Sequence, residues 1–151
     1  MPQSLSAVYL HLIFSTKNRV PWLRDSDFRA EVHAYLGSVS NQLDCPPIVI
    51  GGVEDHVHVV ARLGRTISQA EWVKEIKRVS NSWIKKRDPE LCDFKWQSGY
   101  GVFSVSASRL DAVKRYVLGQ EEHHRHESFQ DELRNFLREY EIEWDEKYVW
   151  E

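Results

Sequence analysis

The chain of 151 residues has little that could cross-link it and nothing long enough to cross a membrane. Its two cysteines, Cys45 and Cys92, lack the spacing of a metal site, so we expect two free thiols, with a disulfide as the alternative. No apolar run reaches the length of a transmembrane helix. The first residues have no basic region ahead of their apolar run, which His11 interrupts, and this pattern predicts a strand instead of a signal peptide.

The composition and the length of the chain fit one globular domain spanning residues 1–151. Hydrophobic residues make up 42% of the chain and charged residues 28%, and these proportions favour a folded protein over a disordered one. A chain of this length usually forms a single domain and can bury a core without disulfides. We find no internal repeat, low-complexity segment or linker that would divide it.

The net charge of −3 argues weakly against a nucleic-acid partner, but the distribution of the charge reverses that argument. Residues 62–87 contain eight Lys/Arg and two Glu, whereas residues 121–151 contain eleven Asp/Glu and four Lys/Arg. A basic patch on an acidic protein can bind phosphate, because binding follows the local field. Two solvated helix faces of opposite sign would explain the same pattern, and charge alone favours that explanation.

Hydrophobic periodicity predicts strands and helices in the order β-α-β-β-α-β-α, followed by a last amphipathic helix. Strands are expected at 8–16, 48–53, 56–63 and 100–106, and the middle two are expected to form a hairpin. Helices are expected after Asp25 to about 43, from 68 to 88, from 108, and from about 129 to 140. Ser68 with Glu71, and Ser108 with Asp111, are signals for the start of a helix.

The first six elements match a ferredoxin-like α+β fold, in which one antiparallel sheet carries its helices on one face. The remaining elements are then a helix that follows the last strand and a C-terminal helical tail. This arrangement would leave the other sheet face, or an edge, free for a ligand or a second subunit.

Two histidines alternate on the strand predicted at 56–63. Because strand side chains alternate, His56 and His58 should point to the same face, with Cα atoms ~6.6–6.8 Å apart, so both imidazoles could converge on one ion. Val57 and Val59 should point into the core. An isolated His-x-His is weak evidence for metal, and two partly exposed histidines in a sheet are the simpler explanation.

A tyrosine and a glutamine lie four residues apart on the helix predicted after residue 108. On a helix, positions i and i+4 share a face, so Tyr116 and Gln120 should project together. Taken alone, this pair indicates a packed tyrosine and a solvated glutamine. The histidines that follow, at positions 123, 124 and 126, are explained well enough as capping groups of the helix C-terminus.

Considered together, these features resemble a known family. His-hydrophobic-His on a central strand, with a later helix bearing Tyr-x-x-x-Gln, is similar to the single-tyrosine HUH transposases of bacterial insertion sequences and their repeat-associated relatives. These small enzymes move single-stranded DNA between hairpin ends. The resemblance covers nearly the whole chain and is carried by VYLHLIFSTKNR, EDHVHVV, FKWQSGYGVFSVS and YVLGQEEHHRHESFQDEL.

The resemblance implies an enzyme that cleaves and rejoins single-stranded DNA through a covalent 5′-phosphotyrosine. Tyr116 would be the nucleophile, and His56, His58 and Gln120 would bind Mg²⁺ or Mn²⁺, although imidazole ligands by themselves favour softer metals. No residue stands out as the base that takes the proton of Tyr116. The resemblance also implies a homodimer in a bacterial or archaeal cytoplasm, acting on single-stranded DNA with hairpin ends.

Other residues are candidates for DNA binding. Lys74, Arg78 and Lys85 could follow a phosphate backbone or form a solvated face. Trp96 and Tyr100 could stack on an unpaired base, although core packing explains them more simply. Two alternative functions remain, a non-catalytic domain that binds single-stranded nucleic acid or hairpins, and a metal-dependent phosphodiesterase without a covalent step. The sequence shows none of the aromatic signatures of RNA-binding modules with this topology.

Overall fold

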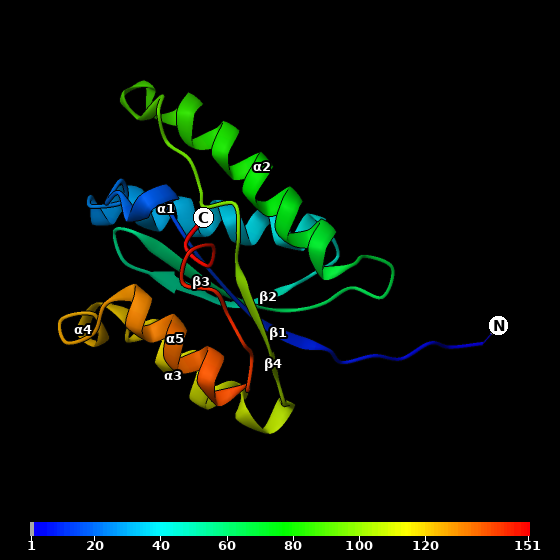
Figure 1. Cartoon of the computed structure of the whole chain (residues 1–151). Helices are drawn as coiled ribbons and strands as arrows, with labels where there is room; N and C mark the ends of the chain where they lie inside the picture. The colour runs from blue at the N-terminus through cyan, green and yellow to red at the C-terminus, as the bar shows by residue number, and fades with distance from the viewer. Residues whose placement is uncertain (1) are drawn as a thin grey trace.

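The computed structural model describes residues 2–151 and is built around a four-stranded antiparallel sheet with the strand order β2-β3-β1-β4 (Figure 1). The strands are β1 (Tyr9–Ser15), β2 (Pro47–Gly52), β3 (His56–Arg62) and β4 (Gly101–Val105). The helices are α1 (Ser26–Gln42), α2 (Gln69–Arg87), α3 (Leu110–Leu118), α4 (Gln120–His123) and α5 (Phe129–Glu139), with short 3-10 helices at Lys17–Arg19, Pro89–Leu91 and Ala107–Arg109. This order confirms the ferredoxin-like α+β fold, with β3 as a central strand.

The main hydrophobic core lies between one face of the sheet and helices α1 and α2. Alternate strand residues supply the sheet side, and Val57 and Val59 are both fully buried there, as their positions predicted. Helix α2 begins where the capping signal placed it, because the Ser68 hydroxyl accepts a hydrogen bond from the Glu71 N–H at 3.0 Å. From its first turns Trp72 reaches the core and donates its indole hydrogen to the Ser40 hydroxyl at 2.9 Å.

The opposite face of the sheet carries a second core and is also covered. Figure 1 shows α1 and α2 on one side of the sheet and α3, α4 and α5 on the other. Ile13 and Phe103 pack there against Phe129, Leu133 and Leu137 of α5. The sequence predicted this face, or an edge, to be free, and the structure leaves only β4 and β2 as sheet edges.

The region around α3 differs from the sequence prediction in two details. Helix α3 begins at Leu110 without a side-chain cap, because the Ser108 hydroxyl contacts Ser106 instead of a helical N–H. The helix then ends at Leu118, the N–H of its C-cap Gly119 bonds to the carbonyls of Arg115 and Tyr116, and α4 starts at Gln120. Tyr116 and Gln120 therefore lie on two consecutive helices, since a glycine inside a helix weakens it by roughly 1 kcal/mol relative to alanine.

The structure also describes the two cysteines and the apolar length of the helices. Both cysteines are free, Cys45 buried and Cys92 exposed. No helix within residues 2–151 is long and apolar enough to cross a membrane.

Candidate active site

The predicted histidine pair is buried between β3 and the helices α3, α4 and α5, which cover this face of the sheet. His56 and His58 are both 0% exposed, which excludes the simpler explanation of two partly exposed histidines. Their ring centroids are 5.2 Å apart. The register places Ser15 opposite His56 and Ile13 opposite His58, so both imidazoles emerge from the face that α5 covers.

The centre of the site is the carboxylate of Glu132, which α5 supplies. It is 1% exposed, and its Oε1 atom lies 3.1 Å from His58 Nε2, 3.2 Å from His124 Nε2 and 3.3 Å from His56 Nε2. Glu132 lies in the first turn of α5, whose N-cap Ser128 accepts the Asp131 N–H at 3.1 Å. The free N–H groups of that turn give the helix end a partial positive charge, which favours a carboxylate there.

Tyr116 and Gln120 reach the same carboxylate despite the break between α3 and α4. The Tyr116 hydroxyl donates a hydrogen bond to Glu132 Oε2, and the Gln120 amide donates to the same atom at 3.1 Å. The Gln120 carbonyl oxygen lies 3.1 Å from His56 Nε2, and Gln120 is buried instead of solvated. The structure thus brings together all four residues that the sequence predicted for the site.

Each imidazole of the pair is held by a second hydrogen bond on its other nitrogen. His56 Nδ1 lies 2.8 Å from Asp55 Oδ1, and His58 Nδ1 lies 2.7 Å from His11 Nε2. Such partners fix the orientation of a ring and direct its free nitrogen toward the site. His11 is therefore a positioning residue on β1, buried beneath the pair.

Burial and hydrogen bonding set the charges of the cluster. Burial raises the pKa of the Glu132 carboxyl, but hydrogen bonds from the surrounding histidines outweigh it and hold that pKa far below its usual range. Burial lowers the pKa of His58 to about 4 and that of His11 to about 3, so both are neutral at neutral pH. Burial also opposes the charged form of His56, but hydrogen bonds to Asp55 and Glu132 outweigh it and raise its pKa to about 9.

The Tyr116 hydroxyl keeps its proton in this environment. Burial and the negative charge of Glu132 raise the pKa of Tyr116 above its ordinary value. A neutral phenol is a weak nucleophile until its proton is accepted by another group. In the structure the hydrogen bond of that proton goes to the Glu132 carboxylate.

The donor set fits a divalent metal ion. His56, His58, His124 and Glu132 each present one ligand atom, and these atoms lie within 4.8 Å of one another. The Gln120 carbonyl oxygen borders the same space. Imidazoles that are oriented by a hydrogen bond on their other ring nitrogen are common metal ligands in proteins, and carboxylate and amide oxygens complete such sites.

Two members of the cluster were missed from the sequence. His124 was explained as a helix-capping group, yet its Nε2 faces Glu132. Glu132 has no local motif, but it falls on the apolar stripe of its helix, between Phe129 and Phe136. An acidic residue on the buried face of an amphipathic helix was the signal that could have identified it.

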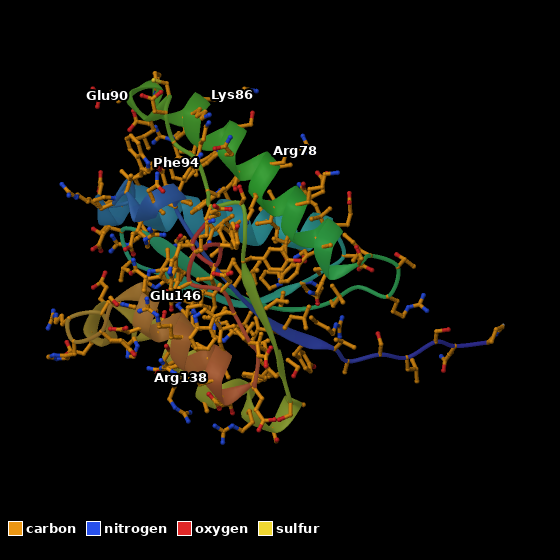
Figure 2. All side chains as sticks on the ribbon, in the orientation of Figure 1. Arg78, Lys86, Glu90, Phe94, Arg138 and Glu146 are labelled. Atoms are coloured by element: carbon orange, nitrogen blue, oxygen red, sulfur yellow. The ribbon has the colours of Figure 1, made fainter. Side chains whose placement is uncertain are left out.

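The candidate DNA-binding residues lie on the other side of the sheet. A groove of about 460 Å³ runs between α2 and the segment before β4, and its lining includes Lys74, Lys77, Arg78, Lys95, Trp96 and Tyr100. Figure 2 shows Arg78 on α2 and Arg138 on α5, on opposite sides of the sheet. Lys85 is further along α2, outside the groove. Trp96 is only 7% exposed and donates its indole hydrogen to Ser80, so most of its ring packs in the core.

The comparison with protein families decides what kind of protein this is. The model of the family described as "Transposase IS200 like" matches residues 4–120. The chain belongs to the IS200-like transposase family. The match includes all four predicted site residues and ends at Gln120, before His124 and Glu132.

Solved structures show the same fold as this IS200-like family member. One is a "putative transposase" from Deinococcus radiodurans R1, with a TM-score of 0.64 and 21% identity, covering 78% of this chain and 95% of that one. Another is a REP-associated tyrosine transposase bound to a REP hairpin, with a TM-score of 0.56 and 12% identity, covering 78% of this chain and 68% of that one. A search of curated proteins gives no match.

Proposed function

We propose that the protein is a transposase that cleaves and rejoins single-stranded DNA at hairpin-bearing ends, with Tyr116 as the nucleophile. The observation that carries this proposal is the convergence of Tyr116, Gln120 and the histidine pair on one buried site. Hairpin-bearing DNA is proposed because one neighbour in fold is a tyrosine transposase bound to a REP hairpin.

The proposed reaction conserves the energy of the phosphodiester bond. The Tyr116 oxygen attacks the phosphorus and loses its proton, the bond from phosphorus to the 3′ oxygen breaks, and that oxygen leaves as a 3′-OH after gaining a proton. The 5′ end remains attached to Tyr116 as a phosphotyrosine. A 3′-OH from another strand reverses the step and joins the two strands, so no hydrolytic water is consumed.

His56, His58 and Gln120 would hold Mg²⁺ or Mn²⁺ in this proposal. A bound divalent cation would neutralise charge on a non-bridging phosphate oxygen. The protein's own contribution is to fix the imidazoles through Asp55 and His11, and to hold the Tyr116 hydroxyl beside them.

Tyr116 is accessible to a DNA strand from a groove of about 470 Å³ beside β4. The lining of this groove includes Tyr116, His11, Arg109, Phe136 and Tyr140. Arg109 supplies a cation that can pair with a phosphate on the approach to the hydroxyl. The groove supports a reaction on a flexible single strand, since such a strand can bend into a recess beside a sheet edge.

DNA outside the reacting phosphate would bind along the basic surface of α2. Lys74 and Arg78 line a groove there together with Tyr100, which is 37% exposed and can stack on a base. Arg78 also pairs with Glu75 at 2.6 Å, which reduces its free charge. Lys85 would extend this contact along the helix, and the exposed edge of Trp96 would border it.

A homodimer is the proposed assembly, with two copies meeting at the β4 edge. An edge strand presents unpaired backbone groups that a second copy can complete. The Tyr140 hydroxyl donates to the Ser104 carbonyl at 2.7 Å, so one acceptor of this edge is already occupied. Light scattering at micromolar concentration tests the dimer, and a mass equal to one chain of 17.8 kDa contradicts it.

One experiment separates the proposal from both alternatives. The protein is incubated with Mg²⁺ and a labelled single-stranded oligonucleotide that contains a hairpin, and the mixture is run on a denaturing gel. A covalent protein–DNA band that disappears with Tyr116→Phe is expected. Binding without cleavage would indicate a non-catalytic domain, and cleavage without a covalent band would indicate a phosphodiesterase.

A further inference from the structure

We infer that Glu132 is a metal ligand contributed by α5, and that its carboxylate adapts the histidine site to Mg²⁺ or Mn²⁺. This inference rests on the proposed function, because it concerns the same metal site. It adds a residue that lies outside the family match, which ends at Gln120. The ligand would therefore come from outside the matched region.

The first argument is the position of the carboxylate. Glu132 Oε1 faces the Nε2 atoms of three histidines at 3.1–3.3 Å, and all four ligand atoms lie within 4.8 Å of one another. His56 and His58 are held by other groups on their Nδ1 atoms, so their Nε2 atoms are the ones directed at this space. A cation at their meeting point would contact Glu132 as readily as the imidazoles.

The second argument is the charge of the buried group. A carboxylate that is 1% exposed loses most of its hydration, and this loss is costly unless a cation compensates it. Within residues 2–151 no lysine or arginine pairs with Glu132, and its ionic partners are all histidines. A divalent ion would supply the compensating charge.

The third argument is metal preference. Imidazole nitrogens favour softer ions such as Zn²⁺, whereas Mg²⁺ and Mn²⁺ favour oxygen ligands. His56, His58 and Gln120 alone would give two nitrogens and one amide oxygen. Glu132 adds an anionic oxygen beside the imidazoles of His56, His58 and His124, which makes the donor set more favourable to a hard cation.

The position of α5 is firmly fixed, as a ligand requires. Phe129 and Leu133 flank Glu132 on the helix and pack in the second core. On the outer face, the Arg134 guanidinium binds both Glu146 oxygens at 2.7 and 3.0 Å, and the same carboxylate accepts the indole hydrogen of Trp150 at 3.0 Å. The C-terminal segment thus clamps the helix that carries the carboxylate.

Metal titration tests the inference without any DNA. Binding of Mn²⁺ alone is measured by calorimetry on the full chain, on Glu132→Gln and on Glu127→Gln. Glu127 bonds to His123 at 2.6 Å beside the site but is not among the ligand atoms, so it is the matched control. We expect Glu132→Gln to weaken Mn²⁺ binding on the order of 10–100-fold and Zn²⁺ binding less, and the control to change both less than about threefold.

Equal Mn²⁺ affinity in Glu132→Gln and the unaltered chain overturns the inference, as does an absence of Mn²⁺ binding by the unaltered chain. If Glu132→Gln does not fold, crystals of the unaltered chain soaked in Mn²⁺ decide the question. Anomalous density next to the Glu132 carboxylate is expected, and an ion on the histidines with Glu132 turned away refutes it. Tyr116→Phe should keep its Mn²⁺ affinity, so failure of the covalent reaction and failure of this inference give different results.

Discussion

Gly51→Ala should disturb the active site without changing any residue proposed to act in it. Gly51 lies opposite His58 in the sheet, and α3 rests directly on it. A Cβ atom at this position would lie 2.6 Å from the Val117 carbonyl oxygen and 2.9 Å from Val117 Cγ1. Ordinary contacts begin at 3.4 Å, so α3 must retreat by roughly 0.8 Å, and backbone cannot move aside as a flexible side chain can.

This displacement has a calculable effect on stability and on the reaction. Forcing a methyl group into a packed interface typically lowers the free energy of unfolding by about 1–3 kcal/mol. Tyr116 is adjacent to Val117 and must move with it. Misplacing a reacting group by roughly 1 Å can reduce a rate by about 100-fold, so formation of the covalent DNA adduct should fall by one to two orders of magnitude.

Urea denaturation and the initial rate of adduct formation measure the two effects. Gly99→Ala is the matched control, because its Cβ atom would meet only the Gln97 amide at 3.7 Å, an ordinary contact. The control should keep the stability and the rate of the unaltered chain. If Gly51→Ala is as stable and as fast as the control, the close seating of α3 on β2 is not what positions Tyr116.

Two further predictions concern His58 and His33. His58→Ala should abolish adduct formation and lower the free energy of unfolding by about 1–3 kcal/mol, because His11 and Glu132 lose a partner; normal cleavage with Mg²⁺ would remove His58 from the site. Burial and the charge of Arg29 lower the pKa of His33 to about 4, so stability present above the unfolded value of 6.5 is lost as the pH falls toward 4. In His33→Leu, the free energy of unfolding should therefore fall less between pH 6.5 and pH 4, by at most about 2 kcal/mol after allowance for the partial exposure of His33. The same fall in His33→Leu as in the unaltered chain would contradict this prediction.

Local patterns predicted the parts of the fold that depend on neighbours in sequence. Strand alternation placed His56 and His58 on one face, and the capping signal at Ser68 placed the start of α2, because both depend on a few adjacent residues. The signal at Ser108 failed because its hydroxyl has an alternative partner in Ser106. Such competition between nearby polar groups is decided by geometry that a spacing rule does not contain.

The centre of the site depends on tertiary packing and was not predicted. Glu132 meets His58 across 74 residues, on a helix whose placement depends on the second core and on the C-terminal clamp. A break at Gly119 predicts that Tyr116 and Gln120 do not share one helix face, yet both side chains reach Glu132. The sequence did not show which face of the sheet the later helices cover. The site residues meet on that covered face.

The identity of the residue that becomes bound to DNA tests the central claim most directly. The adduct formed with Mg²⁺ and a hairpin-bearing single strand is digested with nuclease and protease, and the modified peptide is sequenced by mass spectrometry. The account predicts a nucleotide 5′-phosphate on Tyr116, and no adduct from Tyr116→Phe, which should lose only about 1 kcal/mol of stability because Glu132 keeps its other donors. A nucleotide on any other residue, or cleavage that persists in Tyr116→Phe, would contradict it.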